Sequence, residues 1–461
     1  MKKHLALVAA VAVLSSSAYA TKARLGALGQ GRDGSYYISD TRNVFYNPSA
    51  IVDMNKYVVA ELGEANNGGA QGGNVRASTT VDRWTAPNAE GGFFGSMGRV
   101  AYGVYLGFQD AEANGACRNN VYSNTAAGAI VDDLPVLGCV GRPITVAAGV
   151  PNAAAVDFLG QDNRVDLFVG GDQFLKWGLG YYWASSTDQV LGTGTATTTL
   201  GRASDTNGAR LGLEWNNLKY WLNVTWKDVA TIASAKTALN EGAKPEQVYS
   251  GKSNWSTGLS WTHKMWTVYW NSELKEATID QNDAAATSGA MVHTRAARQQ
   301  HKIGVGYQKA VNSKATLLAN LDLVFSNARF IRSPSTSITA GAGVLIDAGM
   351  SGWALPLNVG FETEVFSWLT ARATVSQNLA ALNHEFRNEH SGTTNYLKSG
   401  VRLRPLGSTD VNAGATLEFG KLKVDGLVGT TVAGGGPSTA TRRGVLALDQ
   451  LLTRVGASYW F

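Results

Sequence analysis

The sequence predicts an all-β fold: a transmembrane, antiparallel, up-and-down β-barrel of about sixteen strands, with roughly 14 to 18 as the range. Three observations indicate this fold. Apolar and polar residues alternate with a period of two over many short segments. Short turns and long polar stretches also alternate along the chain. Finally, the segment 452–461 places an apolar residue at every second position from Val455 and ends on the aromatic residue Phe461. A closing strand of this kind would seal the barrel and present its apolar face to lipid.

The amino terminus has the parts of a secretory signal peptide, which we place at residues 1–20. Two lysines near the start precede an uninterrupted apolar run from Leu5 to Leu14, and Ala18 and Ala20 supply the small residues of a cleavage site. The apolar run is too short to cross a bilayer as a helix, and no later segment approaches the ~20 apolar residues that a helical span requires. We therefore expect an exported protein without a helical membrane anchor.

The composition fits a barrel that crosses a membrane with strands. Glycine (53 residues), tryptophan (13) and tyrosine (16) are abundant among the 461 residues, and charged residues make up only 16%. Soluble domains typically carry ~25% charged residues. Lipid-facing strands exclude charge and gather aromatic residues at the membrane interfaces. Removal of the two lysines at positions 2 and 3 lowers the formal net charge from +5 to +3, which is too small to indicate nucleic-acid binding.

Runs with a period of two predict the individual strands. In the run 100–108, for example, apolar residues occupy every second position from Val100 to Phe108. The apolar residues of each run would face lipid and the residues between them would face the lumen. The predicted strands cover 56–64, 100–108, 165–169, 177–183, 211–215, 220–226, 255–261, 266–270, 303–307, 317–325, 355–361, 369–375, 411–419, a segment from 422 onward, and 455–461.

The connections between the strands alternate strictly between short and long. Seven short turns lie near 98–99, 172–173, 216–217, 263–264, 310–313, 366–367 and 420. Eight long polar stretches lie at 65–89, 111–162, 187–206, 230–253, 280–297, 327–353, 378–409 and 431–450. Outer-membrane barrels have short turns on the periplasmic side and long loops outside. Seven turns and eight loops predict sixteen strands with both termini in the periplasm.

Three strand-like runs fall inside the predicted long stretches, at 74–83, 337–346 and 396–404. We interpret them as extensions within the outer loops, because counting one of them alone would place a long loop in the periplasm. Eighteen strands would result if two of them paired.

The residues between the lipid-facing positions predict a charged lumen. Eight of the charged candidates are basic and seven are acidic, so the two signs nearly cancel. The predicted pore-lining residues are Arg164, Asp166, Arg210, Glu214, Lys219, Lys227, Glu273, Lys275, Lys302, Asp322, Glu362, Glu364, Arg372, Lys423 and Asp425. A sixteen-stranded barrel encloses a water-filled space, so this set predicts a diffusion channel with a weak ion preference. The alternative is that these residues pair with one another and only stiffen the wall.

The two cysteines, Cys117 and Cys139, lie in the same long polar stretch, 111–162. In an oxidising compartment they predict a disulfide that closes a loop and stabilises the fold by roughly 3 kcal/mol. The stretch is long enough to fold into the mouth of the barrel as a constriction, or it can lie entirely outside.

The start of the mature chain resembles FadL-type and PorV-type outer-membrane proteins. The resemblance is carried by residues 23–29 (Ala-Arg-Leu-Gly-Ala-Leu-Gly) and 46–51 (Tyr-Asn-Pro-Ser-Ala-Ile). Segments 357–375 and 408–428 also resemble the carboxy-terminal hairpins of those families. The similarity covers about a fifth of the chain, and its short motifs have modest specificity.

The resemblance implies a segment before the first strand that carries an Asn-Pro-Ala element. In FadL-type barrels, which have fourteen strands, this segment is a plug and hydrophobic ligands pass laterally through the wall. We assign residues 21–55 to such a plug or to a periplasmic segment, and residues 56–461 to the barrel. The chain departs from the family pattern at Ser49, where the family has Ala, in its two additional predicted strands and in its polar inward face. The Asn47-Pro48 pair can also simply form a turn before the first strand.

Signals for chemistry are weak, and we predict no enzyme, no metal site and no cofactor. The pairs His384-Glu385 and Glu389-His390 lack the helix that would place metal ligands on one face, so they indicate a solvated loop. Asp280, Asn282 and Asp283 could bind calcium but also fit a solvated loop tip. No nucleophile-elbow or phosphate-loop motif is present in the sequence.

The sequence therefore predicts a porin-like channel of the bacterial outer membrane for passive diffusion of small polar solutes. The alternatives are a FadL-type transporter of hydrophobic compounds and a closed barrel that serves as a structural or recognition scaffold. The expected partners are outer-membrane lipid, small solutes and the barrel-assembly machinery, which would bind through Phe461. A homotrimer is compatible with a sixteen-stranded porin, and no nucleic-acid partner is expected.

Overall fold

The computed structural model describes residues 21–31, 34–54, 56–63, 89–108, 144–145, 156–157, 164–191, 199–234, 247–252, 254–282, 291–334, 345–391, 394–405, 409–430 and 454–461. The predicted signal peptide, Cys117, Cys139, the run 74–83 and most of the stretch 111–162 lie outside these residues. No helix in the described part of the chain is long and apolar enough to span a membrane.

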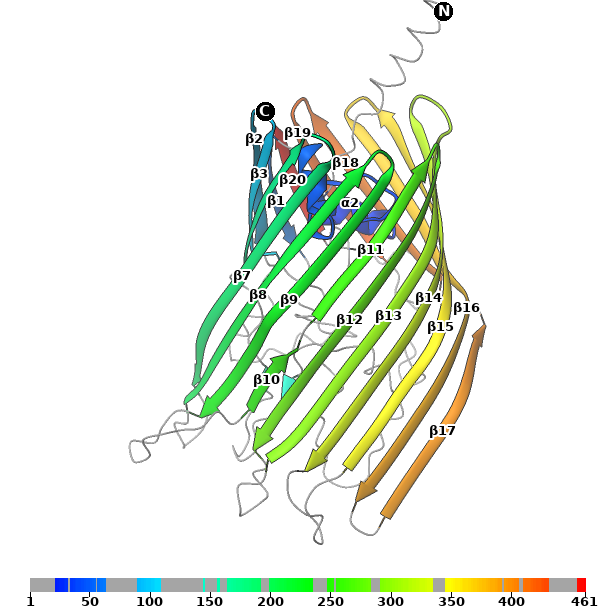
Figure 1. Ribbon diagram of the computed structural model, residues 1–461. Coiled ribbons are helices and arrows are strands. Elements are labelled where there is room, and N and C mark those ends of the chain that lie inside the picture. The colour runs from blue at the N-terminus through cyan, green and yellow to red at the C-terminus, as the bar shows by residue number, and fades with distance from the viewer. Residues whose placement is uncertain are drawn as a thin grey trace, which may run out of the picture.

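Apart from one short two-stranded ribbon, the described strands form one closed antiparallel sheet, which confirms the predicted barrel (Figure 1). The first strand pairs with the second on one side and with the last, residue 57 opposite Trp460, on the other. Eighteen strands belong to this sheet, but two positions in the wall are each filled by two successive segments. The segments at 247–251 and 254–263 both lie between the same two neighbours, and those at 394–405 and 409–419 both pair with the strand before them. The wall therefore has sixteen positions, as the sequence predicted.

The strands of the wall are β1 (Tyr57–Gly63), β2 (Ala89–Met97), β3 (Val100–Leu106), β6 (Val165–Asp172), β7 (Lys176–Leu191), β8 (Thr199–Trp215), β9 (Leu218–Ser234), β10 (Gln247–Gly251), β11 (Asn254–His263), β12 (Trp266–Asn282), β13 (Met291–Ala310), β14 (Ala315–Pro334), β15 (Leu345–Phe366), β16 (Leu369–Ser391), β17 (Thr394–Pro405), β18 (Thr409–Phe419), β19 (Leu422–Thr430) and β20 (Arg454–Trp460). A separate two-stranded ribbon pairs β4 (Ile144–Thr145) with β5 (Val156–Asp157).

All seven predicted short turns connect adjacent antiparallel strands. Positive φ angles at Gly98, Asn216, Lys264 and Gly420 allow four of these turns to reverse the chain tightly.

The predicted lengths of several long connections were wrong, because the strands continue far into them. β16 and β17 fill most of the stretch 378–409, and the run 396–404 is part of the wall rather than of a loop. Strands β12 to β16 contain 17 to 23 residues, whereas a tilted strand needs only ~9–11 residues to cross a bilayer. β1 to β3 lie near one end of the barrel, and the longer strands continue far past them toward the opposite end (Figure 1). Outside the hydrocarbon a strand needs no apolar face, so a polar sequence does not end it.

The wall alternates between an apolar outer face and a mostly polar inner face. On β3, Tyr102 and Leu106 are exposed on the outside, whereas the alternate residues Ala101 and Tyr105 are buried. One part of the prediction for this strand was wrong. β3 ends at Leu106, and Phe108 is buried inside the barrel instead of facing lipid. Gly107, with φ +75°, turns the chain at this point.

Residues 21–31 and 34–54, which we call the plug segment, lie inside the barrel near its short-turn end (Figure 1). The segment contains the helix α2 (Lys22–Ala27) and the 3₁₀ helices η1 (Thr41–Phe45) and η2 (Pro48–Val52). The side chains of Asp40 and Asn47 accept hydrogen bonds from backbone N–H groups at the starts of η1 and η2. The Asn47-Pro48 pair thus begins a short helix, with proline in the first turn where its missing N–H is tolerated.

An apolar cluster fixes one end of the plug segment to the wall. Val44, Phe45, Ile51 and Met54 pack with apolar and aromatic side chains of β1, β2, β3 and β6. The rings of Phe45 and Phe108 stack with centroids 4.1 Å apart. Because the chain turns inward at Gly107, the Phe108 ring joins the packing that holds the plug segment in place.

Candidate functional site

Buried ion pairs join the plug segment to β1 and β2. The Arg42 guanidinium lies 2.6 Å from Glu61 Oε2 and 2.7 Å from Glu90 Oε1. Lys22 Nζ lies 2.6 Å from the other oxygen of Glu90, and the Tyr105 hydroxyl donates to Glu90 at 2.7 Å. These side chains are almost completely buried. Burial lowers the pKa of Lys22, and the nearby Arg42 charge lowers it further.

A second group of ion pairs joins the plug segment to β15, β16 and β19. Arg24 Nε lies 3.0 Å from Glu362, and Arg24 Nη1 lies 3.3 Å from Asp40 within the plug segment. Arg372 of β16 contacts both Glu362 and Asp425, and Asp425 also accepts a hydrogen bond from the Thr21 hydroxyl at 3.1 Å. Burial raises the pKa of Asp40 to about 6, although the neighbouring Arg24 opposes this rise.

Close backbone packing holds the plug segment against β7 and β8 on another part of the wall. A Cβ atom at Gly212 would lie 2.0 Å from Asn47 Oδ1, and one at Gly178 would lie 2.2 Å from the Pro48 carbonyl oxygen. Next to this contact, Lys176 Nζ lies 2.7 Å from Asp53. The plug segment therefore crosses the lumen, from β19 and β20 at Thr21 to β7 and β8 at residues 47–53.

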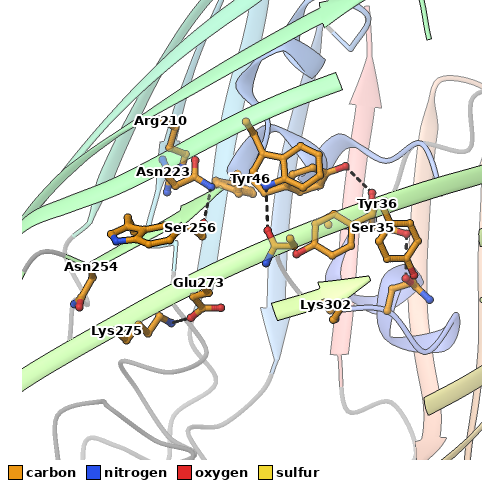
Figure 2. Close-up of a pocket in the computed structure, with 18 of the residues that line it drawn as sticks. Ser35, Tyr36, Tyr46, Arg210, Asn223, Asn254, Ser256, Glu273, Lys275 and Lys302 are labelled. Atoms are coloured by element: carbon orange, nitrogen blue, oxygen red, sulfur yellow. Dashed lines mark hydrogen bonds and ion pairs between the residues drawn. The ribbon is translucent and has the colours of Figure 1, made fainter. Parts of the chain in front are cut away.

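A pocket of about 420 Å³ lies between the plug segment and the wall strands β7 to β9 and β11 to β15 (Figure 2). Its size falls within the range of ordinary small-molecule sites, which is roughly 300–1,000 Å³. On β12 the lining residues run from Tyr269 to Lys275, away from the short turn that begins the strand at Trp266. The pocket therefore lies on the side of the plug segment that faces the long connections.

Aromatic rings from both the plug segment and the wall form one side of the pocket. Tyr36 stacks on Trp221, with ring centroids 5.3 Å apart and planes 9° apart, and Tyr46 meets Trp221 edge to face. The indole N–H of Trp221 donates to Asn271 Oδ1 at 3.2 Å. Asn223 donates to Ser256 Oγ at 3.1 Å, while its own Oδ1 is buried and accepts no hydrogen bond from the described residues.

A buried cluster of two arginines and one aspartate forms the other side of the pocket. Arg164 Nη2 lies 2.9 Å and Arg210 Nη1 lies 2.7 Å from the same oxygen, Asp166 Oδ1. The two guanidinium groups also lie over the Tyr182 ring, with their carbons 3.9 and 4.5 Å from the ring centroid. All three charged side chains are at most 4% exposed.

The fifteen predicted pore-lining residues separate into three groups. Six line the pocket, namely Arg164, Arg210, Glu273, Lys275, Lys302 and Asp322, and Asp166 lies directly behind them. Three belong to the second group of plug contacts, namely Glu362, Arg372 and Asp425. The remaining five form ion pairs elsewhere on the wall, namely Glu214, Lys219, Lys227, Glu364 and Lys423.

The prediction omitted the charged residues that link the plug segment to β1 and β2. Glu61 was a detectable candidate, because it occupies an inward position in the alternation of the first strand. Glu90 gave no such signal, since it precedes two glycines in a segment with few side chains to define a face. Lys22 and Arg42 belong to the plug segment, where no strand periodicity indicates which way their side chains point.

The loop candidates for metal binding form no cluster in the described part of the chain. His384 is exposed, and His293 contacts Asp280 at 2.6 Å as an isolated exposed pair. No group of three or more His, Cys, Asp or Glu side chains suited to hold a metal ion occurs among the described residues.

The chain matches no protein-family model and no curated protein. Among solved structures it is similar to the ferric yersiniabactin uptake receptor FyuA from Yersinia pestis, with TM-score 0.40 and 8% identity over 57% of this chain and 44% of that one. It is also similar to the ferric-catecholate import receptor Fiu from E. coli K12, with TM-score 0.33 and 9% identity over 81% of this chain and 69% of that one. A third is the toluene transporter TodX from Pseudomonas putida, with TM-score 0.31 and 9% identity over 92% and 93% of the two chains. The chain thus spans less than half the length of FyuA, and the barrel assignment rests on the strand pairing described above.

Proposed function

We propose that this protein is a transport protein of the bacterial outer membrane, and that its plug segment controls the passage of small polar solutes through the lumen. The observation that carries the proposal is the path of residues 21–54 across a polar lumen, with buried ion pairs to β1, β2 and β15 and close packing against β7 and β8. Transport is favoured over catalysis, because the charged groups of the lumen pair with one another or with the plug segment.

The outer face supports the membrane location. Large apolar side chains such as Leu106 of β3, Leu179 of β7, Val305 of β13 and Phe361 of β15 are more than a third exposed on the outside of the wall. In water such a belt would be far larger than the apolar patches that soluble proteins tolerate. A closed barrel satisfies the backbone hydrogen bonds of its strands within the wall, which a bilayer requires.

The inner face supports polar rather than hydrophobic solutes. The pocket presents asparagine, serine, lysine and arginine side chains beside its aromatic rings. The FadL-type and PorV-type resemblance of residues 23–29 and 46–51 agrees with a plug but not with a hydrophobic lumen. A steadily open porin would need a water path past the plug segment, so we favour passage that depends on the plug segment.

The chemistry of the plug contacts suits a segment that can leave its position. Buried ion pairs add little net stability compared with apolar packing, although breaking one partner is strongly destabilising. When such an interface separates, both of its surfaces regain water, which solvates the ionisable side chains of Arg42, Glu61 and Glu90. The apolar cluster around Phe45 is confined to one side of the segment.

Single-channel recording in planar bilayers tests the proposal. We expect the wild-type protein to give small or rare currents and the double variant Arg24→Gln, Arg42→Gln to give larger or longer openings. Arg329→Gln, which removes an exposed ion pair with Asp347 on the strand extensions, is the matched control. Large steady currents that are the same in all three proteins would contradict control by the plug segment. Silence in all three would favour a closed scaffold.

The same proposal includes the expected partners. Outer-membrane lipid would surround the apolar belt, and Phe461 at the end of the closing strand would be the residue that the barrel-assembly machinery binds. A homotrimer remains part of the hypothesis and is tested by native mass spectrometry in detergent.

A further inference from the structure

The pocket beneath the plug segment carries more positive than negative charge. Its lining contains four basic side chains, Arg164, Arg210, Lys275 and Lys302, and two acidic ones, Glu273 and Asp322. With Asp166 behind them, the described groups sum to four positive and three negative charges, a net charge of +1. Arg164 and Arg210 lie 2.9 and 2.7 Å from the same carboxylate oxygen, Oδ1 of Asp166.

The arrangement of Arg210 points to an anion. Its Nη1 donates to Asp166, and its other N–H donors have no hydrogen-bond partner among the described residues. Of the two lysines, Lys275 pairs with Glu273 at 2.9 Å, whereas Lys302 lies 3.9 Å from Asp322 and 5.6 Å from the centroid of the Tyr36 ring. A guanidinium presents several donors in a fixed plane and binds carboxylate oxygens in pairs. Because the side chain is 4% exposed, solvent screens its charge only weakly.

The part of the pocket next to Arg210 points to hydroxyl groups. Asn223 Oδ1 is a buried acceptor without a donor in the described structure, while the amide nitrogen of the same side chain is engaged by Ser256. Leaving a buried acceptor unsatisfied costs ~1–3 kcal/mol, so a ligand hydroxyl that donates to it would remove this penalty. Figure 2 shows Asn223 and Arg210 beside each other on the same side of the pocket.

We propose that this pocket binds a small hydroxylated organic acid, with its carboxylate on Arg210 and a hydroxyl group on Asn223 Oδ1. The proposal rests on the proposed function, for which it names the substrate class. The position of the pocket on the side of the long connections places the acid where a solute entering from outside the cell would first meet the plug segment.

Two probes that differ at one carbon atom test the charge requirement. D-gluconate and sorbitol have the same six-carbon hydroxylated chain, but gluconate ends in a carboxylate where sorbitol has a hydroxymethyl group. Isothermal titration calorimetry of the full-length protein in detergent should give a dissociation constant for gluconate at least about tenfold below that for sorbitol. Equal binding of the two probes, or binding of neither, would overturn the proposal.

Two variants locate the site. Arg210→Gln should weaken gluconate binding about tenfold or more without strengthening sorbitol binding. Asn223→Asp keeps the size of the side chain, places a negative charge in the pocket and should weaken gluconate selectively. It therefore tests the site even if Arg210→Gln does not fold. Lys227→Gln is the control, because Lys227 pairs with Asp205 outside the pocket and should leave gluconate binding unchanged. Unchanged gluconate binding in a folded Arg210→Gln or Asn223→Asp protein would overturn the proposal.

The two proposals fail in different ways. Calorimetry in detergent requires no passage through a membrane. If gluconate binds but the currents do not differ between the wild type and the plug variant, only the transport mechanism is refuted. Plug-dependent currents without gluconate binding would refute only the assignment of the substrate class.

Discussion

Arg42 of the plug segment and Glu61 of the first wall strand form a buried ion pair with 2.6 Å between Nη1 and Oε2. Glu61 occupies a position on β1 whose neighbours Ala60 and Leu62 face outward. The ion pair therefore links the plug segment inside the lumen to β1, the strand that closes the barrel by pairing with β20. Closure of the wall and placement of the plug segment are coupled at this residue.

Replacing Arg42 with methionine should destabilise the folded protein by about 3–5 kcal/mol, because Glu61 and Glu90 would then lack their shared cation in a buried site. The free energy of unfolding in urea, measured in lipid vesicles, checks this value. A Glu61→Gln, Arg42→Met double variant should recover part of the loss, since it also removes one uncompensated charge. A single variant as stable as the wild type would show that Arg42 does not anchor the plug segment.

Gly212 should tolerate no side chain, because a Cβ atom there would lie 2.0 Å from Asn47 Oδ1 and 2.7 Å from Ser49 N. We expect Gly212→Ala to displace residues 47–49, to destabilise the protein by about 1–3 kcal/mol and to make the plug segment more sensitive to protease. Gly400→Ala is the matched control, because a Cβ at Gly400 of β17 would meet no atom within 4 Å. Equal protease sensitivity of the two variants would argue against close packing at β8.

The sequence predicted the wall well because one physical rule governs it. Lipid outside and water inside impose a period of two, and a tight turn needs residues such as Gly98 or Asn216 that accept a positive φ. The rule ceases to apply beyond the bilayer. There both faces of a strand contact water, so the strand-like run 396–404 could be assigned to an outer loop as readily as to the wall. The same reasoning explains why the predicted long stretches were too long.

Sequence reasoning identified the residues of the candidate site that lie on regular strands, but not those of the plug segment. Arg210 and Lys302 were identified because they stand at inward positions in regular strands. Tyr36 and Tyr46, which cover the pocket, come from a segment of short helices and bends, and no periodicity in the sequence indicates where their side chains point. Which charges meet across the lumen, such as Arg24 and Glu362, depends on the path of that segment rather than on spacing.

Truncation of the last side chain should affect assembly more than stability. The Phe461 ring is half exposed and stacks on Phe93 with centroids 5.7 Å apart, a contact worth about 0.5–1.5 kcal/mol. If the barrel-assembly machinery binds this residue, Phe461→Ala should lower the amount of folded protein in the outer membrane several-fold more than its unfolding free energy explains. Phe93→Ala, which removes the same ring contact, is the control. Equal yields of the two variants would assign Phe461 a packing role alone.

The pKa of Asp40, raised by burial to about 6, predicts a specific pH dependence of stability. The carboxyl of the unfolded chain has the ordinary aspartate pKa of about 3.8, so between about pH 4 and 6 the folded protein binds this proton more tightly than the unfolded chain does. The contribution of Asp40 to stability is therefore most favourable below about pH 4 and is lost as the pH rises through 6. About two pKa units correspond to a change on the order of 3 kcal/mol.

The variant Asp40→Asn isolates this contribution, because asparagine can still cap the start of η1 but does not titrate. Other carboxyl groups titrate in both proteins, so the quantity to measure is the difference in unfolding free energy between wild type and variant at pH 4.5 and pH 7.5. We expect the wild type to gain stability relative to Asp40→Asn as the pH falls. A difference that does not change with pH would mean that Arg24, 3.3 Å away, together with Arg42 keeps Asp40 ionised throughout this range.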